Sequence, residues 1–130
     1  MESLNFDTTF LIDLQRERRN GEGPAHRFLR ERPTAIPCLS LVAYGEYAEG
    51  FDRPDHPHCL LMLDSFQLLP FDRETAVGYS RISLEFRASG NRIGANDLWI
   101  AAVSLANELP LVTRTVVEFQ RVPGLRVLAY

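Results

Sequence analysis

Short apolar runs that alternate with segments of helical periodicity constrain the fold of this chain most strongly. LNF at 4–6, AIPCLS at 35–40, FQLLPF at 66–71 and LPLVT at 109–113 have the length and composition of strands. LRVLAY at 125–130 is typical of an edge strand. Strands that alternate with helices indicate an α/β fold, in which a mainly parallel sheet carries helices on both faces.

Polar side chains stand where helices are expected to begin. A hydroxyl, carboxyl or amide group there can accept hydrogen bonds from the free backbone N–H groups of the first turn. The segment that follows LPLVT is predicted as a short turn before the edge strand. The expected caps are Thr8 or Thr9 for the helix at 10–19, Ser40 for the helix at 41–50, Asp72 for the helix at 73–88, and Asn96 for the helix that follows.

The size of the chain favours one domain over residues 1–130. No apolar run approaches the length of a membrane span, so no membrane partner is expected. The first residues, MESLNFD, lack the basic region of a signal peptide. Cys38 and Cys59 form no CxxC pair, and we expect them to be buried or reduced. These features predict a cytoplasmic protein.

All 14 basic residues are arginines, in a chain whose formal net charge is −3. The absence of lysine excludes Schiff-base chemistry and the P-loop, both of which need a lysine amine. An arginine guanidinium donates two parallel hydrogen bonds and therefore suits phosphate. The same arginines could equally lie on solvated helix faces.

Three carboxylates are predicted to meet at the carboxyl edge of the sheet. Asp7 follows the first strand directly, Glu46 lies in the helix after the second strand, and Asp97 begins the apolar helix that precedes the fourth. Ligands of open parallel sheets bind at this edge. Grouped carboxylates repel one another unless a cation joins them, and oxygen ligands favour Mg²⁺ or Mn²⁺. Singly, each acid could be a helix cap, a dipole partner or a solvated residue.

Five segments in order resemble the PIN-domain ribonucleases, and more narrowly the VapC-type toxins of toxin–antitoxin pairs. They are FDTTFLIDL, LSLVAYGEYAEGF, LLPFDRETAVGYSRI, RIGANDLWIAAVSL and LVTRTVVEFQRVPGLRV. The resemblance implies a three-layer α/β/α sandwich and a Mg²⁺- or Mn²⁺-dependent endoribonuclease. It makes Asp7 and Asp97 the main metal ligands, with Glu46 completing the cluster. Hydroxyls of Thr8, Thr9 and Thr113 would support the site.

The chain departs from this family near its end. Many relatives carry Asp or Asn at the position of Thr115, which has no charge but can still bond a metal-bound water. Glu118 becomes a fourth acid if the turn places it inward, and a solvated residue otherwise. With three acids, the resemblance implies one firmly held metal, and a second that arrives with RNA.

The resemblance also implies partners. Toxins of this kind form dimers and are held inactive by a cognate antitoxin of the VapB type, so a homodimer and an antitoxin are expected. The apolar faces of the first helices, with Phe10, Leu14 and Phe28, are candidates for the antitoxin groove; the alternative is that these residues belong to the core. The candidate contacts to the RNA substrate are Arg16, Arg92 and Arg114.

Two other functions stay open at this point. A PIN-fold binding module that has lost catalysis and only pairs with an antitoxin or RNA would explain Thr115. A DNA nuclease of the same broader fold is disfavoured because the chain is short. The segment from Asp55 to Cys59 does not predict a zinc site, because no second pair of ligands stands elsewhere. The serines do not predict a serine hydrolase, because a matching histidine is absent.

Overall fold

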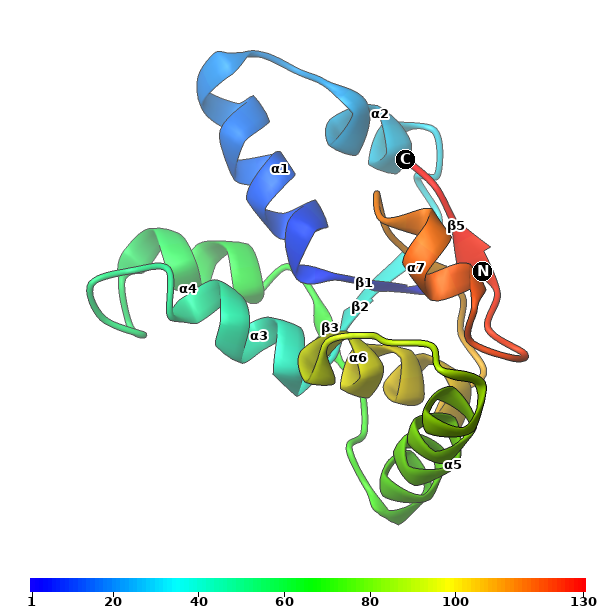
Figure 1. Cartoon of the computed structure of the whole chain (residues 1–130). Coiled ribbons are helices and arrows are strands. Elements are labelled where there is room, and N and C mark those ends of the chain that lie inside the picture. The colour runs from blue at the N-terminus through cyan, green and yellow to red at the C-terminus, as the bar shows by residue number, and fades with distance from the viewer.

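Five parallel strands form the centre of the computed structural model, which describes residues 1–130 (Figure 1). The order across the sheet is β3-β2-β1-β4-β5, and every neighbouring pair is parallel. The predicted parallel sheet is therefore confirmed. The strands are β1 (Ser3–Phe6), β2 (Ile36–Leu39), β3 (Gln67–Leu68), β4 (Leu111–Val112) and β5 (Val127–Leu128).

The register of the three middle strands fixes what leaves the carboxyl edge. Phe6 of β1 pairs with Leu39 of β2 and with Val112 of β4. The residues that follow these three positions are Asp7, Ser40 and Thr113, and all three are buried. One acid and two hydroxyls therefore leave neighbouring strands at the same level.

Seven helices surround the sheet in the predicted three-layer arrangement (Figure 1). One face carries α1 and α2, the other carries α6 with α5 packed outside it, and α7 contacts β5. Helix α3 contacts both α1 and α6, and α4 packs on α3. The helices are α1 (Thr8–Asn20), α2 (Pro24–Arg30), α3 (Leu41–Ala48), α4 (Pro57–Leu63), α5 (Arg73–Ser89), α6 (Ala95–Ala106) and α7 (Val116–Gln120).

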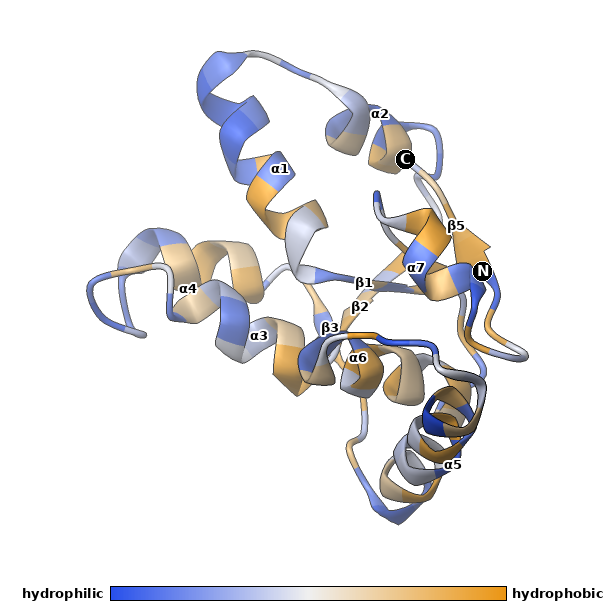
Figure 2. Cartoon of the chain, viewed as in Figure 1, coloured by the Kyte–Doolittle hydropathy of each residue, from blue (hydrophilic) through white to orange (hydrophobic).

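Alternation along β1 divides the core between the two faces. Phe6 packs against Phe10 of α1 and Phe28 of α2, with ring centroids 4.3 and 6.0 Å apart. On the opposite face, the Asn5 side chain donates a 2.8 Å hydrogen bond to the Ser104 hydroxyl of α6. Figure 2 shows the matching pattern on α1, whose first half is apolar and whose far end is hydrophilic.

Of the two alternatives for the apolar faces of the first helices, the core is confirmed and the antitoxin groove is wrong. Phe10, Leu14 and Phe28 are 0%, 6% and 4% exposed and belong to the main core cluster. Their helical spacing reflects packing on β1, so they present no surface to a partner. Cys38 and Cys59 are buried free thiols, as expected. None of the helices is both long and apolar enough to cross a membrane.

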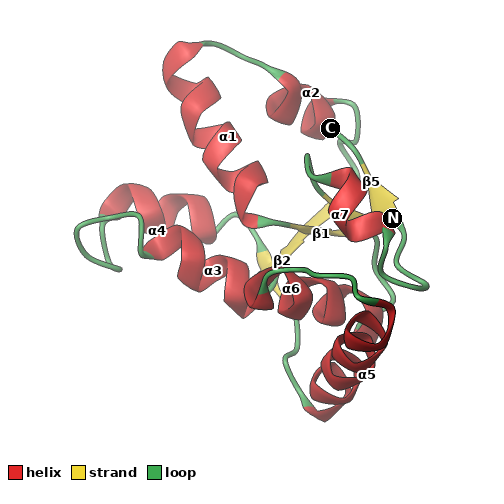
Figure 3. Cartoon of the chain, viewed as in Figure 1, coloured by secondary structure: helices red, strands yellow, loops and turns green.

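Two helix starts and one turn differ from the sequence predictions. Asp7, rather than Thr8 or Thr9, caps α1, because its carboxylate accepts from the Phe10 backbone N–H. Gly94, rather than Asn96, precedes α6. The predicted turn after β4 contains the short helix α7 (Figure 3). The caps at Ser40 and Asp72 are confirmed, the latter as a full capping box.

Candidate active site

Asp7 is the most enclosed of the predicted acids of the site. Its carboxylate is 3% exposed and accepts hydrogen bonds from the Phe10 backbone N–H at 3.1 Å and the Thr9 hydroxyl at 2.8 Å. A third comes from the Thr113 hydroxyl at 2.5 Å. Burial raises the pKa of Asp7 more than these three hydrogen bonds lower it. The carboxylate is thus fixed in place but poorly compensated.

A chain of hydroxyls runs from Asp7 through Thr113 to Thr115. Because Thr113 donates to Asp7, its oxygen is free to accept, and it lies 3.0 Å from the Thr115 hydroxyl. The Thr115 backbone N–H also donates to the Thr113 oxygen at 3.0 Å. Thr115 therefore supports Asp7 indirectly, through Thr113.

Asp97 lies in the first turn of α6 and is partly buried. Its pKa is raised to about 6, first by burial and then by the negative charges of Glu46, Asp7 and Glu118. The negative charges of three acids from other elements thus reach Asp97, and two of them, Asp7 and Glu46, are the acids that the resemblance implied beside it. Glu118 is an exposed residue of α7, and it reaches the group by charge rather than by contact.

Glu46 joins the site from α3 through two neighbours. One carboxylate oxygen accepts from the Thr8 hydroxyl at 2.5 Å, and the other accepts from the Asn96 side-chain amide at 3.0 Å. Asn96 is therefore a site residue that the sequence reasoning assigned to a cap. Its position directly before Asp97 was the available signal, because an amide that does not cap can turn toward the same edge.

The donor set fits a hard divalent cation. None of the ion pairs in the structure involves Asp7, Glu46 or Asp97, so no basic side chain of this chain neutralises them. The oxygens available are carboxylates and hydroxyls, which Mg²⁺ prefers. No group of three or more acidic, histidine or cysteine side chains is arranged to hold a metal ion directly. The acids therefore converge less closely than the sequence predicted, because threonine hydroxyls bond Asp7, and a threonine and an asparagine bond Glu46.

The three arginines predicted to contact RNA fall into two places. Arg16 and Arg114 both pair with Asp13 of α1, each at 3.1 Å. Arg92 is an exposed residue before α6, and its carbonyl accepts a hydrogen bond from Arg121 at 2.9 Å. The structure therefore brings two of the three together beside α1.

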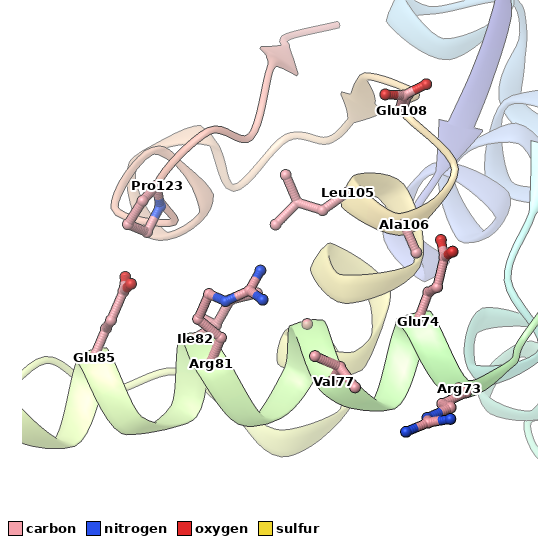
Figure 4. A pocket seen from close by; sticks show the side chains of 11 residues that line it. Arg73, Glu74, Val77, Arg81, Ile82, Glu85, Leu105, Ala106, Glu108 and Pro123 are labelled. Atoms are coloured by element: carbon pink, nitrogen blue, oxygen red, sulfur yellow. The ribbon is translucent and has the colours of Figure 1, made fainter.

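One hollow of the surface lies away from these acidic residues. It has a volume of about 750 Å³ and is bounded by α5, the end of α6 and Pro123 (Figure 4). Its lining includes Leu105, which lies roughly 12 Å along α6 from Asp97 at 1.5 Å per residue. None of the acidic residues at the carboxyl edge borders this hollow.

Comparison with known proteins identifies the fold family. The PIN domain model matches residues 5–125. Ribonuclease VapC of Rickettsia bellii is 38% identical over 98 residues, covering 69% of this chain and 73% of that protein. The tRNA(fMet)-specific endonuclease VapC of Salmonella typhimurium is 29% identical over 112 residues, covering 80% and 83%.

A solved structure agrees with this assignment. VapBC2 from Rickettsia felis, bound to a DNA fragment from its promoter, superimposes with a TM-score of 0.81 at 20% identity. The match covers 98% of both chains. At 20% identity this structure supports the fold alone. The family assignment rests on the PIN domain model and on the two VapC relatives. This chain belongs to the PIN-domain family, among the VapC proteins.

Proposed function

We propose that this protein is a Mg²⁺- or Mn²⁺-dependent endoribonuclease, a toxin that a cognate antitoxin neutralises. The observation that carries the proposal is the uncompensated acidic edge, where the charges of Glu46 and Asp7 raise the pKa of Asp97 and none of the three acids takes part in an ion pair. The chain belongs to the PIN-domain family, and its VapC relatives are named as a ribonuclease and a tRNA-specific endonuclease. These names support RNA cleavage as the reaction. RNA is accordingly the proposed substrate.

Each acid has a distinct part in this proposal. Asp7 and Asp97 bind the cation, and Glu46 reaches it directly or through a water. When bound there, the cation neutralises the phosphate oxygens and lowers the pKa of a water for attack on phosphorus. Products with 5′-phosphate and 3′-hydroxyl ends are expected from this attack.

The neighbouring polar groups position the acids. Thr9 and Thr113 hold both oxygens of Asp7, so its carboxylate keeps one orientation. Thr8 and Asn96 hold Glu46 between α1 and α6. Outer-shell partners of this kind orient ligands and tune their affinity for metal. These residues do not touch the substrate in this account; they act through the carboxylates.

The antitoxin and the homodimer are proposed because this chain belongs among the VapC proteins. The Rickettsia felis neighbour was solved as VapBC2 on promoter DNA, which indicates a second protein beside that VapC chain. Because Phe10, Leu14 and Phe28 are buried, a partner must use other surfaces than the ones first expected.

Assays of RNA cleavage and growth arrest with single-residue variants test the proposal. Asp7→Asn and Asp97→Asn keep side-chain size and remove one negative charge each, so both should abolish metal-dependent RNA cleavage and growth arrest. Asp52→Asn, which changes an exposed acid away from the site, should behave as wild type. Full metal-dependent cleavage by either site variant would refute the assignment.

A second candidate function is a non-catalytic PIN module that binds an antitoxin or RNA. Two observations favour it: Thr115 is uncharged, and no three acids are arranged to hold a metal directly. Such a module would bind RNA without cleaving it and would not bind Mn²⁺ at millimolar concentration.

A further inference from the structure

Asp13 is a buried acid that the proposed reaction does not use. It lies on α1, six residues after Asp7, and its side chain is 9% exposed. Its carboxylate accepts from Arg16 Nη1 at 3.1 Å, from Arg114 Nη1 at 3.1 Å and from the Tyr130 hydroxyl at 2.7 Å. One carboxylate thereby joins α1, the segment after β4 and the segment after β5.

The two arginines are far more exposed than the acid that they bond. The side chains of Arg16 and Arg114 are 58% and 56% exposed, although the acid between them is enclosed. A guanidinium has five N–H donors, and each arginine bonds Asp13 through a single nitrogen. The other guanidinium nitrogens of these two arginines make no hydrogen bond within the chain. Two positive charges around one negative charge leave this cluster with a net positive charge.

Tyr130 keeps Asp13 in place. Its ring packs edge-on against Phe10 with centroids 4.7 Å apart, and its hydroxyl donates to the carboxylate. Burial, followed by the bond to Asp13, raises the pKa of Tyr130, so the hydroxyl remains a donor at neutral pH. The carboxylate therefore has a fixed orientation without needing either arginine.

The position of Arg114 relative to the acidic edge is fixed as well. It stands between Thr113, which bonds Asp7, and Thr115, which bonds Thr113. Asp13 lies about 9 Å along α1 from Asp7 at 1.5 Å per residue. A phosphate bound at the arginines is consequently a different one from the phosphate at Asp7.

We propose that Asp13 is a positioning residue that holds Arg16 and Arg114 as a fork for an RNA phosphate beside the one that is cleaved. The proposal rests on the proposed ribonuclease function. An RNA strand that enters the acidic edge meets repulsion, and a fixed pair of guanidiniums next to that edge offsets it. Arg92 lies outside this fork.

Salt dependence of RNA binding tests the two arginines. A fluorescent single-stranded RNA is titrated at several salt concentrations in the cleavage-deficient Asp97→Asn background. Arg16→Gln and Arg114→Gln should each reduce the slope of log K against log salt by about 0.7, the value for one phosphate contact on a single strand. Arg126→Gln is the matched control, because Arg126 is likewise exposed (63%) and paired with an acid, Glu2, at 3.1 Å, but lies directly before β5; it should leave the slope unchanged. Unchanged slopes in both fork variants overturn the proposal.

Turnover tests Asp13 itself. Asp13→Asn removes a negative charge, so RNA affinity should hold or increase while kcat falls roughly tenfold or more through lost orientation. Loss in kcat from Asp13→Asn and Arg114→Gln should be less than additive in the double variant. A lower melting temperature with unchanged kcat would assign Asp13 a purely structural role. Tyr130→Phe, which removes only one hydrogen bond, should lower kcat in the same direction if Asp13→Asn does not fold.

The two proposals fail separately. If wild type binds RNA with the expected slopes but never cleaves it, the ribonuclease function is wrong and the fork remains. If wild type cleaves RNA while Arg16→Gln and Arg114→Gln retain the wild-type slope, the function remains and the fork is wrong.

Discussion

The Thr113 hydroxyl donates a 2.5 Å hydrogen bond to the Asp7 carboxylate, across 106 residues of sequence. The bond exists because β1 and β4 are neighbours, with Phe6 opposite Val112, so the next residue of each strand leaves the sheet together. It supplies one of three donors to a buried acid. The order of the sheet and the geometry of the acidic edge are thus linked at this bond.

Replacement of Thr113 by valine should affect stability and activity together. Valine keeps the shape and removes the donor, leaving a buried carboxylate with one bond fewer, a loss of about 1–3 kcal/mol in the free energy of unfolding. The pKa of Asp7 should rise further, because the bond from Thr113 lowers it. Urea denaturation and cleavage rates measure the two effects. Thr113→Ser retains the hydroxyl and should stay near wild type; equal losses in both variants would contradict this explanation.

Asp97 should make the metal-free protein less stable as pH rises. Its pKa is raised to about 6 from 3.8, so the folded state binds this proton more tightly than the unfolded state. The associated stabilisation is present below pH 3.8 and is lost as pH rises through about 6. Asp97→Asn should remove this dependence and be more stable than wild type at pH 7. Thermal melts in EDTA between pH 4 and 8 test this; identical curves for both proteins would count against it.

Glu17 should stabilise the connection between α1 and α2. Burial opposes its ionisation, but backbone N–H groups of His26, Ala25 and Gly23 and the His26 ring lower its pKa to about 2. The stabilisation is present above the ordinary pKa of 4.5 and is lost as pH falls toward 2. Glu17→Gln should lower the free energy of unfolding at pH 7 by about 1–3 kcal/mol. Glu31→Gln, an exposed acid, serves as the control in the same denaturation series.

Asn96 should influence metal affinity without being a ligand. Its amide bonds Glu46 at 3.0 Å, and loss of an outer-shell partner typically costs about 10–100-fold in affinity. Asn96→Ala should therefore weaken Mn²⁺ binding while the far-ultraviolet circular dichroism spectrum stays unchanged. Asn91→Ala is the matched control, because Asn91 bonds only Ser89. Wild-type affinity in Asn96→Ala would remove Asn96 from the site.

The parts of the site that the sequence predicted follow from strand ends. Asp7 and Thr113 directly follow apolar runs, and parallel strands bring such positions to one edge. Their meeting could be predicted without knowing any side-chain contact. The cap at Ser40 follows from the same local pattern.

The parts that were missed depend on pairs chosen by tertiary packing. Asn96 has the composition of a cap, but α6 begins after Gly94 and the amide turns to Glu46, 50 residues away in sequence. Asp13 and Tyr130 are 117 residues apart, and only the position of β5 at the sheet edge brings them together. Phe10 has the spacing of an exposed apolar stripe and of a core stripe alike, and burial on β1 decides between them.

Calorimetric titration with Mn²⁺ measures metal binding at the acidic edge, on which the proposed reaction depends. Wild type and Asp52→Asn should bind the ion, and Asp7→Asn and Asp97→Asn should not, because each removes one of the two main carboxylate ligands. Absence of binding to wild type at millimolar Mn²⁺, or binding that persists in both site variants, would show that Asp7 and Asp97 are not the metal ligands.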